Sequence, residues 1–149
     1  QIKLGISRDR SYGKSIDAVL EKYKAGGNIV VHSGKDVFES LFQMLIRDRV
    51  DCMLGLPEEV MYVAEQQGVK DQIASLTLKE NENTYDSWLG YVACSKTDWG
   101  KQTIGKINQI LKAKRPTPEY RGAYERWLDK HAHENYRKLY DDIFLKINE

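Results

Sequence analysis

The 149-residue sequence has only two cysteines and no long apolar run. Two cysteines are too few for the disulfide framework that holds many small secreted domains together. The longest apolar stretches cover a few residues, far short of the roughly 18 that a membrane-spanning helix needs. The 23 basic and 22 acidic side chains give a net charge of +1, so the overall charge indicates no nucleic-acid partner and no anionic membrane surface.

The motifs of common enzyme and cofactor sites are also absent. The sequence contains no GxGxxG or GxxxxGK[ST] phosphate loop, no GxSxG nucleophile turn, no HExxH pair and no CxxC pair. His131 and His133 lie close in sequence, but side chains two residues apart diverge on a helix, so we interpret them as marking a helix junction. We therefore expect no catalytic residue, no bound metal and no cofactor.

What the first half does contain is an alternation of strand and helix patterns. Residues 2–6, 28–32 and 50–54 read as strands, and an amphipathic helix pattern follows each of them. Ser15 and Asp36 are the predicted N-caps of the first two helices, and Pro57 takes the first position of the third. Three successive β-α units predict an α/β fold with a parallel-dominated sheet, flanking helices and right-handed crossovers.

The second half changes character near residue 95. Residues 73–78 and 87–94 are predicted as two further strands, whereas residues 98–149 show only helical patterns and an N-cap at Thr117. Residues 1–95 hold 11 basic and 14 acidic side chains, and residues 96–149 hold 12 and 8, so the charge changes sign there. We predict an α/β segment over residues 1–95 and a helical C-terminal segment over residues 96–149.

Cys52 and Cys94 both fall in predicted strands, where cysteine usually behaves as a small core residue. We expect no disulfide between them. The helical segment carries an apolar and aromatic face that we interpret as a packing face. It could fold back on residues 1–95 or pair with a second copy, and we expect a homodimer through the C-terminal helices. The face consists of Ile104, Ile107, Leu111, Tyr120, Tyr124, Trp127, Tyr136, Tyr140 and Phe144.

The candidate binding site is the edge of the sheet where the strands end. Parallel sheets bind ligands at the carboxyl ends of their strands, and three loops reach that edge, residues 7–15, 32–36 and 55–58. Hydroxyls, cations and free backbone N–H groups around Gly13, just before a helix, suit an anion, although a solvated turn with an ordinary serine cap fits as well. The candidate ligand-binding residues are Arg8, Ser11, Tyr12, Gly13, Lys14, Ser15, Ser33, Gly55 and Glu58.

Several short stretches occur in a characteristic order: residues 3–6 (KLGI), 11–17 (SYGKSID), 38–51 ending in IRDRVD, 53–58 (MLGLPE), 91–100 (YVACSKTDWG), 124–128 (YERWL) and 136–144. In this order they resemble the second lobe and closing helices of a type II periplasmic solute-binding protein, of the amino-acid-binding kind called solute-binding protein family 3. The resemblance covers nearly the whole chain. It places residues 11–17 at the family's ligand-anion loop and residues 53–58 at its ligand-contacting strand end.

The resemblance implies recognition of a small solute without catalysis in the periplasm or another extracytoplasmic compartment. The partner would be a membrane transporter of the ABC type or a sensor. The missing first lobe, together with Gln1 in place of an initiator Met, predicts a segment of a longer precursor with a signal peptide. Amino-acid binders of the family place an acidic residue directly after the strand-end glycine. Here Leu56 stands there and Glu58 is displaced by two, which argues against a standard free amino acid as the ligand. The expected ligand is a small anionic or amino-acid-like solute.

Two other classes of function stay open at this point. The same fold includes dehydratase-like and cell-wall lytic enzymes, so the fold alone does not decide between binding and catalysis. The basic helical segment could also serve an interaction module. Turnover of a substrate would favour an enzyme, and saturable binding without turnover would favour the binding protein.

Overall fold

A computed structural model describes residues 2–81, 85 and 89–147 of the chain. It consists of two compact units, Gln1–Gln72 and Ile73–Glu149. The boundary expected at residue 95 therefore falls inside the second unit. None of the helices in the described ranges combines the length and the apolarity that crossing a membrane requires.

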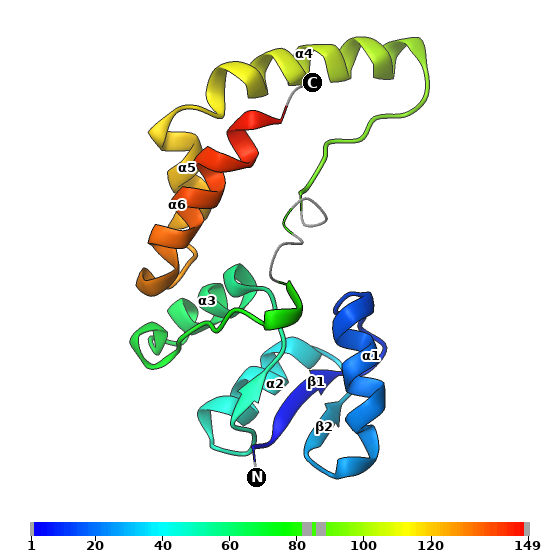
Figure 1. The fold of residues 1–149 in the computed structure, drawn as a ribbon, viewed down its shortest axis with the longest axis vertical. Coiled ribbons are helices and arrows are strands. Elements are labelled where there is room, and N and C mark those ends of the chain that lie inside the picture. The colour runs from blue at the N-terminus through cyan, green and yellow to red at the C-terminus, as the bar shows by residue number, and fades with distance from the viewer. Residues whose placement is uncertain (1, 82–84, 86–88, 148–149) are drawn as a thin grey trace. The chain divides into compact units, whose positions relative to one another are not determined.

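The first unit is an α/β structure built on a three-stranded parallel sheet (Figure 1). Strand β1 spans Leu4–Ser7, β2 spans Ile29–His32 and β3 spans Cys52–Met53. A helix follows each strand, in the order that the sequence predicts. The helices are α1 (Lys14–Tyr23), α2 (Val37–Ile46) and α3 (Pro57–Gln66).

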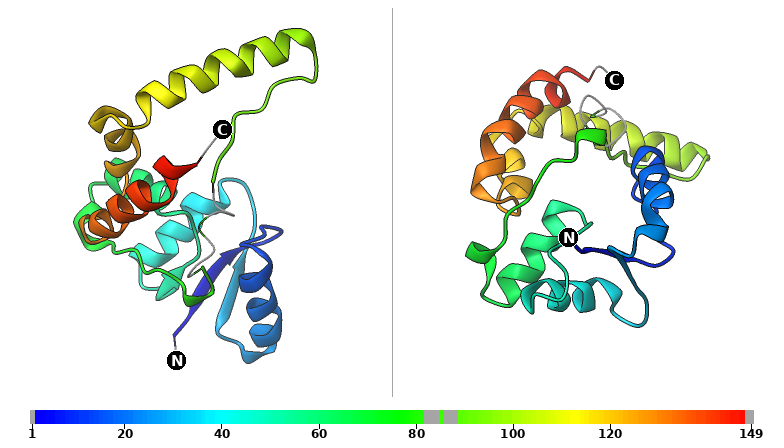
Figure 2. Two further views of the ribbon diagram at one scale, coloured as in Figure 1. Left: turned by 45° about the horizontal axis from the view of Figure 1, so that its top comes forward. Right: turned by 60° about the horizontal axis from the view of Figure 1, so that its bottom comes forward.

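Strand β1 lies in the middle of this sheet, which has the order β2-β1-β3. Leu4 pairs with Ile29 on one side and with Cys52 on the other, and both ladders are parallel. The connection from β1 to β2 and the connection from β2 to β3 run in opposite directions across the sheet. Right-handed crossovers then put α1 and α2 on opposite faces of β1, as the ribbon shows (Figures 1 and 2).

The core of the first unit forms where α2 packs on β1. Leu41, Phe42, Val50 and Met61 have the largest fully buried side chains of the described chain. A Cβ atom on Gly5 would lie 2.9 Å from Leu41 Cδ2 and 3.3 Å from Val50 Cγ2. Glycine in the central strand therefore lets the helix approach the sheet closely.

Glycines follow two helix ends of the first unit, whereas two of its helix starts differ from the predicted caps. Gly27 and Gly68 adopt positive φ values of 72° and 68° beyond α1 and α3, the left-handed conformation in which glycine commonly ends a helix. Ser15 is not an N-cap, because α1 already begins at Lys14 with Gly13 in the cap position. Asp36 does not cap α2 through its side chain, because its backbone is left-handed (φ 53°) rather than extended.

The two strands predicted after residue 72 do not form in the described part of the chain. Residues 73–78 and 89–94 have no strand pairing, and residues 87 and 88 lie outside the described residues. Instead, the Ser75 amide donates a hydrogen bond to Asp129 Oδ2 at 3.0 Å, which ties this segment to the helical unit. Cys94 is therefore not a strand residue, and Cys52 and Cys94 are both free thiols.

The second unit is helical. Its helices are α4 (Asp98–Lys114), α5 (Pro118–Glu125) and α6 (His133–Asp142), with short 3-10 turns at Lys130–Ala132 and Phe144–Lys146. The side chain of Thr97 caps α4 by accepting from the Gly100 amide at 3.1 Å. Thr117 caps α5 by accepting from the Tyr120 amide at 3.3 Å, and Pro118 takes the first helical position, both as predicted.

Aromatic side chains join α5, α6 and the last turn of the second unit. The ring centroids of Tyr124 and Tyr136 are 5.3 Å apart, and those of Tyr140 and Phe144 are 4.9 Å apart. The Tyr140 hydroxyl donates to the Arg115 carbonyl at 2.6 Å, which ties α6 to the end of α4. The rings pack on one another, so the interpretation of these residues as a packing face is confirmed. On α4 itself, Trp99 and Ile110 stay largely exposed.

We expect Gly5→Ala to lower the free energy of unfolding by about 1–3 kcal/mol, because the added methyl group overpacks the contact with Leu41 and Val50. The control is Gly105→Ala within α4, where a Cβ atom meets nothing within 4 Å. The control should gain about 1 kcal/mol from the higher helix propensity of alanine. Urea unfolding followed by circular dichroism measures both changes. A Gly5→Ala protein as stable as wild type would contradict the close approach.

Candidate functional site

The carboxyl ends of the three strands meet at one edge of the sheet. The Arg8 amide donates to the His32 carbonyl at 2.7 Å and so joins the loop after β1 to the end of β2. On the other side, the Leu54 amide donates to the Gly5 carbonyl at 3.1 Å. In the order β2-β1-β3 the connections diverge between β1 and β3, and such a switch point is where open α/β sheets bind ligands.

The loop after β1 is organised by a carboxylate of the protein itself. The Ser11 hydroxyl donates to Asp17 Oδ2 at 2.5 Å, and the Tyr12 amide donates to Asp17 Oδ1 at 2.8 Å. The hydrogen bond from the Ser11 hydroxyl is the larger cause, and that from the Tyr12 amide the smaller one, that lower the pKa of Asp17 below its ordinary value. Asp17 therefore takes two of the donors that the sequence assigned to an external anion.

Of the other candidate residues of this loop, some have a structural role and others are exposed to solvent. Tyr12 is 9% exposed, and its hydroxyl accepts from the Ser7 amide at 2.8 Å, so the ring supports the end of β1. Gly13 lies directly before α1 and has a φ of 98°, a backbone conformation that would be strained in a residue with a side chain. Arg8 and Lys14 are exposed, and neither forms an ion pair with a residue that the structure describes.

The remaining candidates come from the other loops and from α1. Ser33 is exposed directly after β2, and Ser15 is exposed in the first turn of α1. Glu58 is half-buried in the first turn of α3. A Cβ atom on Gly55 would lie 2.8 Å from Phe38 Cε2, so Gly55 makes room for the Phe38 ring. Its role is in packing at this edge.

An ion pair that the sequence did not single out lies at the switch point. Arg10 Nη2, in the loop after β1, lies 2.8 Å from Glu59 Oε2 at the start of α3. The same oxygen accepts from the Leu56 amide at 3.3 Å, as in a capping box. The guanidinium carbon is 5.7 Å from the centre of the Tyr12 ring and 5.9 Å from that of Phe38, within cation-π range.

The signal for this pair is present in the sequence but incomplete. Glu59 stands at the third position of a helix that begins with Pro57, which predicts a carboxylate folded back on the helix start. A partner on another loop cannot be read from local spacing. Only the order of the strands brings Arg10 next to α3.

Two grooves are hollowed elsewhere on the surfaces of the two units. In the first unit a groove of about 510 Å³ runs along α2 from Lys35 to Arg49, and in the second a groove of about 740 Å³ lies between residues 92–97 and the start of α4. The linings of these two grooves include none of the predicted ligand residues. The groove along α2 has mixed charge, since Lys35 and Arg49 face the same hollow as Asp36 and Glu39.

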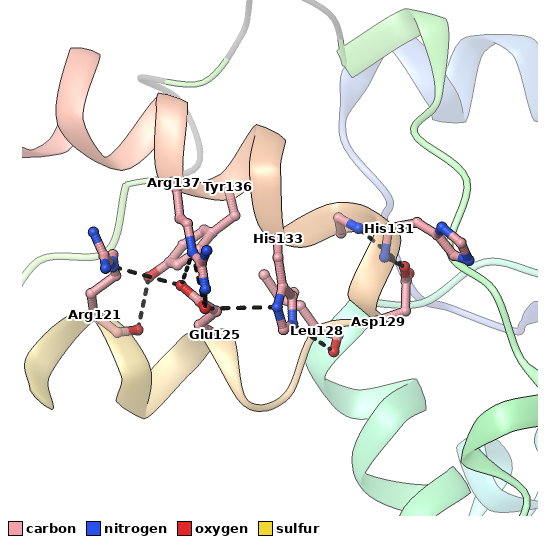
Figure 3. A network of polar contacts seen from close by, with 9 residues as sticks. Arg121, Glu125, Leu128, Asp129, His131, His133, Tyr136 and Arg137 are labelled. Carbon is pink, nitrogen blue, oxygen red and sulfur yellow. Dashed lines mark hydrogen bonds and ion pairs between the residues drawn. The ribbon is translucent and has the colours of Figure 1, made fainter. Parts of the chain in front are cut away.

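No cluster of three or more His, Cys, Asp or Glu side chains within residues 2–81, 85 and 89–147 could hold a metal ion. His131 lies in the 3-10 turn before α6 and His133 is the first residue of α6, so they mark a helix junction as predicted. The His131 amide donates to Asp129 Oδ1 at 2.9 Å, and His133 Nδ1 lies 3.7 Å from Glu125 Oε1 (Figure 3). Both contacts stabilise the junction.

Glu125 is the centre of the polar network that joins α5 to α6. Arg137 Nε lies 3.1 Å and 3.0 Å from the two carboxylate oxygens, and Arg121 Nε lies 3.6 Å from one of them (Figure 3). The hydrogen bond from Arg137 is the main cause that lowers the pKa of Glu125. The arrangement fixes two helices and leaves the Glu125 carboxylate surrounded by the protein's own cations.

Asp129 holds the start of the helical unit in place. Asp129 is 6% exposed, and its carboxylate accepts from the amides of Ser75, His131 and Ala132. Burial alone would raise the pKa of Asp129, but the hydrogen bonds from Ser75 and the two other amides outweigh it and lower the pKa. The group therefore stays ionised as a structural cap.

The chain matches no protein-family model, no curated protein and no solved structure. The geometry at the carboxyl edge of the sheet is therefore the main indication of function. At this edge the described residues include the guanidinium of Arg10, paired with Glu59, and the exposed cations Arg8 and Lys14. The loop that carries them is held by hydrogen bonds to Asp17.

We expect Asp17→Asn to loosen the loop after β1, because the variant loses the charged acceptor of the Ser11 hydroxyl and the Tyr12 amide. Hydrogen exchange of the Tyr12 amide, measured by NMR, should become faster than in wild type. The control is Glu21→Gln on the same helix, whose carboxylate pairs with Lys24 instead. Unchanged exchange at Tyr12 would show that Asp17 does not hold the loop.

We expect Glu125→Gln to destabilise the second unit by about 1–2 kcal/mol at pH 7, since a charge-assisted hydrogen bond is lost. The pKa of Glu125 is lowered in the folded state from its ordinary 4.5, so its stabilisation is present above that pH and is lost as the pH falls through the folded pKa. Tryptophan fluorescence reports this unit, because all three tryptophans lie in it.

The pH series provides the decisive comparison for Glu125. The difference in thermal midpoint between wild type and Glu125→Gln should shrink toward zero at acidic pH, where both side chains are neutral. Asp141→Asn, on the same α6 as Arg137, is the matched control and should behave like wild type throughout. A Glu125→Gln defect that is independent of pH would contradict the electrostatic origin.

Proposed function

We propose that the chain is a non-catalytic recognition module for a small anionic or amino-acid-like solute, which it binds at the carboxyl edge of the sheet. The observation that carries the proposal is the half-buried Arg10 guanidinium at the switch point between β1 and β3. Ligands of open α/β sheets bind at such points. An arginine there can bind a carboxylate or phosphate through two parallel hydrogen bonds.

Two further observations support an anionic solute. Arg8 and Lys14 lie on the same loop as Arg10, and both are exposed and without an ion-pair partner among the described residues. Their charges raise the local concentration of an approaching anion. Asp17 holds the loop in a fixed shape, so binding does not have to order it.

The finer assignment rests on the resemblance of the sequence to solute-binding protein family 3. On this basis the first unit corresponds to the second lobe of a type II periplasmic solute-binding protein, in an extracytoplasmic compartment. The partner would be a transporter or a sensor. Association of two copies through the C-terminal helices stays a prediction, which the exposed Trp99 and Ile110 on α4 favour.

We expect saturable binding of at least one small anion in a panel of carboxylates, phosphate and sulfate, measured by calorimetry with the whole chain. Arg8→Gln and Lys14→Gln should each weaken it by up to about fivefold, the range of an exposed ion pair. The control is Lys24→Gln, at the far end of α1 and already beside Glu21.

Three results would contradict the proposal. Failure of every anion in the panel to bind would remove the site. Equal losses in the three lysine and arginine variants would place the anion elsewhere. Conversion of a bound solute into product, followed by NMR over hours, would favour an enzyme on this fold.

A further inference from the structure

We propose that Glu59 occupies Arg10 as an internal placeholder, and that the solute is a carboxylate that takes its place. The inference rests on the proposed function and adds to it the chemical class of the ligand and the residue that competes with it. In the unliganded chain the site is closed by the protein's own carboxylate. Binding is then an exchange of one carboxylate for another at the same guanidinium.

The contact between Arg10 and Glu59 uses little of what the guanidinium can offer. Only Nη2 donates to another residue in the described chain, and it reaches only Oε2 of Glu59, at 2.8 Å. A guanidinium has five N–H donors, and its strongest pairing with a carboxylate uses two parallel bonds. A ligand that binds in the two-bond geometry therefore makes a stronger contact than the one it displaces.

The guanidinium is held ready for such a ligand. The rings of Tyr12 and Phe38 both lie within cation-π distance of its central carbon. The Ser7 amide fixes the Tyr12 hydroxyl, and Gly55 leaves the space that the Phe38 ring fills. Arg10 loses little conformational freedom when a ligand binds, yet 29% of its side chain stays accessible to solvent.

Glu59 can leave Arg10 without becoming a buried, uncompensated charge. Its side chain is 39% exposed, and Oε2 also accepts from the Leu56 amide. After exchange the carboxylate still caps α3 and is hydrated, so the large penalty of an unpaired buried charge does not arise. The same oxygen that binds Arg10 in the unliganded chain then serves the helix start alone.

The test compares wild type with Glu59→Gln and Arg10→Lys, using succinate as the probe in calorimetry. Glu59→Gln removes the competing charge but keeps an oxygen for the Leu56 amide, so succinate should bind about tenfold more tightly. Arg10→Lys keeps the positive charge and loses the two-bond geometry, so binding should weaken at least about tenfold. Circular dichroism confirms that each variant is folded.

The controls separate this inference from the proposed function. Glu65→Gln removes a carboxylate from the same helix that pairs with Lys70, and it should leave succinate binding unchanged. Succinamide, which has no charge, should not bind, and inorganic phosphate should bind more weakly than succinate. Binding by wild type that Glu59→Gln does not tighten, or that Arg10→Lys does not weaken, overturns the placeholder alone.

Two further outcomes would contradict more than the role of Glu59. Phosphate that binds wild type more tightly than succinate overturns the carboxylate class. Absence of binding of succinate and phosphate by every protein, Glu59→Gln included, overturns the proposed function together with this inference.

Discussion

The pairing of β1 along both of its edges is the constraint on which the first unit depends. Because β2 and β3 lie on either side of it and run parallel to it, all three strands end at one edge. The connections must then diverge, which places the loop after β1 beside the start of α3. Gly5 allows the close packing of α2 on β1, since a Cβ atom there would lie 2.9 Å from Leu41 Cδ2 and would force that side chain to shift. Packing at the centre of the sheet thus decides which loops are neighbours at its edge.

Carboxylates of the chain itself also fix junctions within each of the two units. Asp17 holds the loop after β1, Glu59 caps α3, Glu125 joins α5 to α6, and Asp129 anchors Ser75. Each accepts hydrogen bonds from backbone amides or cations that would otherwise need water. Because several charged side chains bind other groups of the same chain, the net charge of the sequence says little about its partners.

The sequence predicted the elements of the first unit well because periodicity and helix-stop glycines are local signals. It was wrong on the caps of α1 and α2, since Gly13 and not Ser15 precedes α1, and the left-handed backbone of Asp36 keeps its side chain from capping α2. It was also wrong on strands after residue 72. The composition of residues 73–78 favours a strand, but a strand also needs the free edge of another strand to pair with. Here the Ser75 amide donates to Asp129 instead. The Arg10–Glu59 pair was missed for the same reason, because its partners are joined by topology and not by spacing.

In the proposed binding site Arg10 is already paired with Glu59, and this pairing affects both the affinity for a solute and the stability of the chain. The internal carboxylate lowers the apparent affinity of a ligand, because the competent state is only the fraction in which Arg10 is released. The same contact stabilises the unliganded chain and keeps the guanidinium from binding unspecific anions of low affinity. Only a ligand that offers a better geometry than Glu59, or further contacts to Arg8 and Lys14 on the same loop, gains from the exchange. Selectivity at this edge then comes from the contact that the protein gives up as much as from the contacts that it makes.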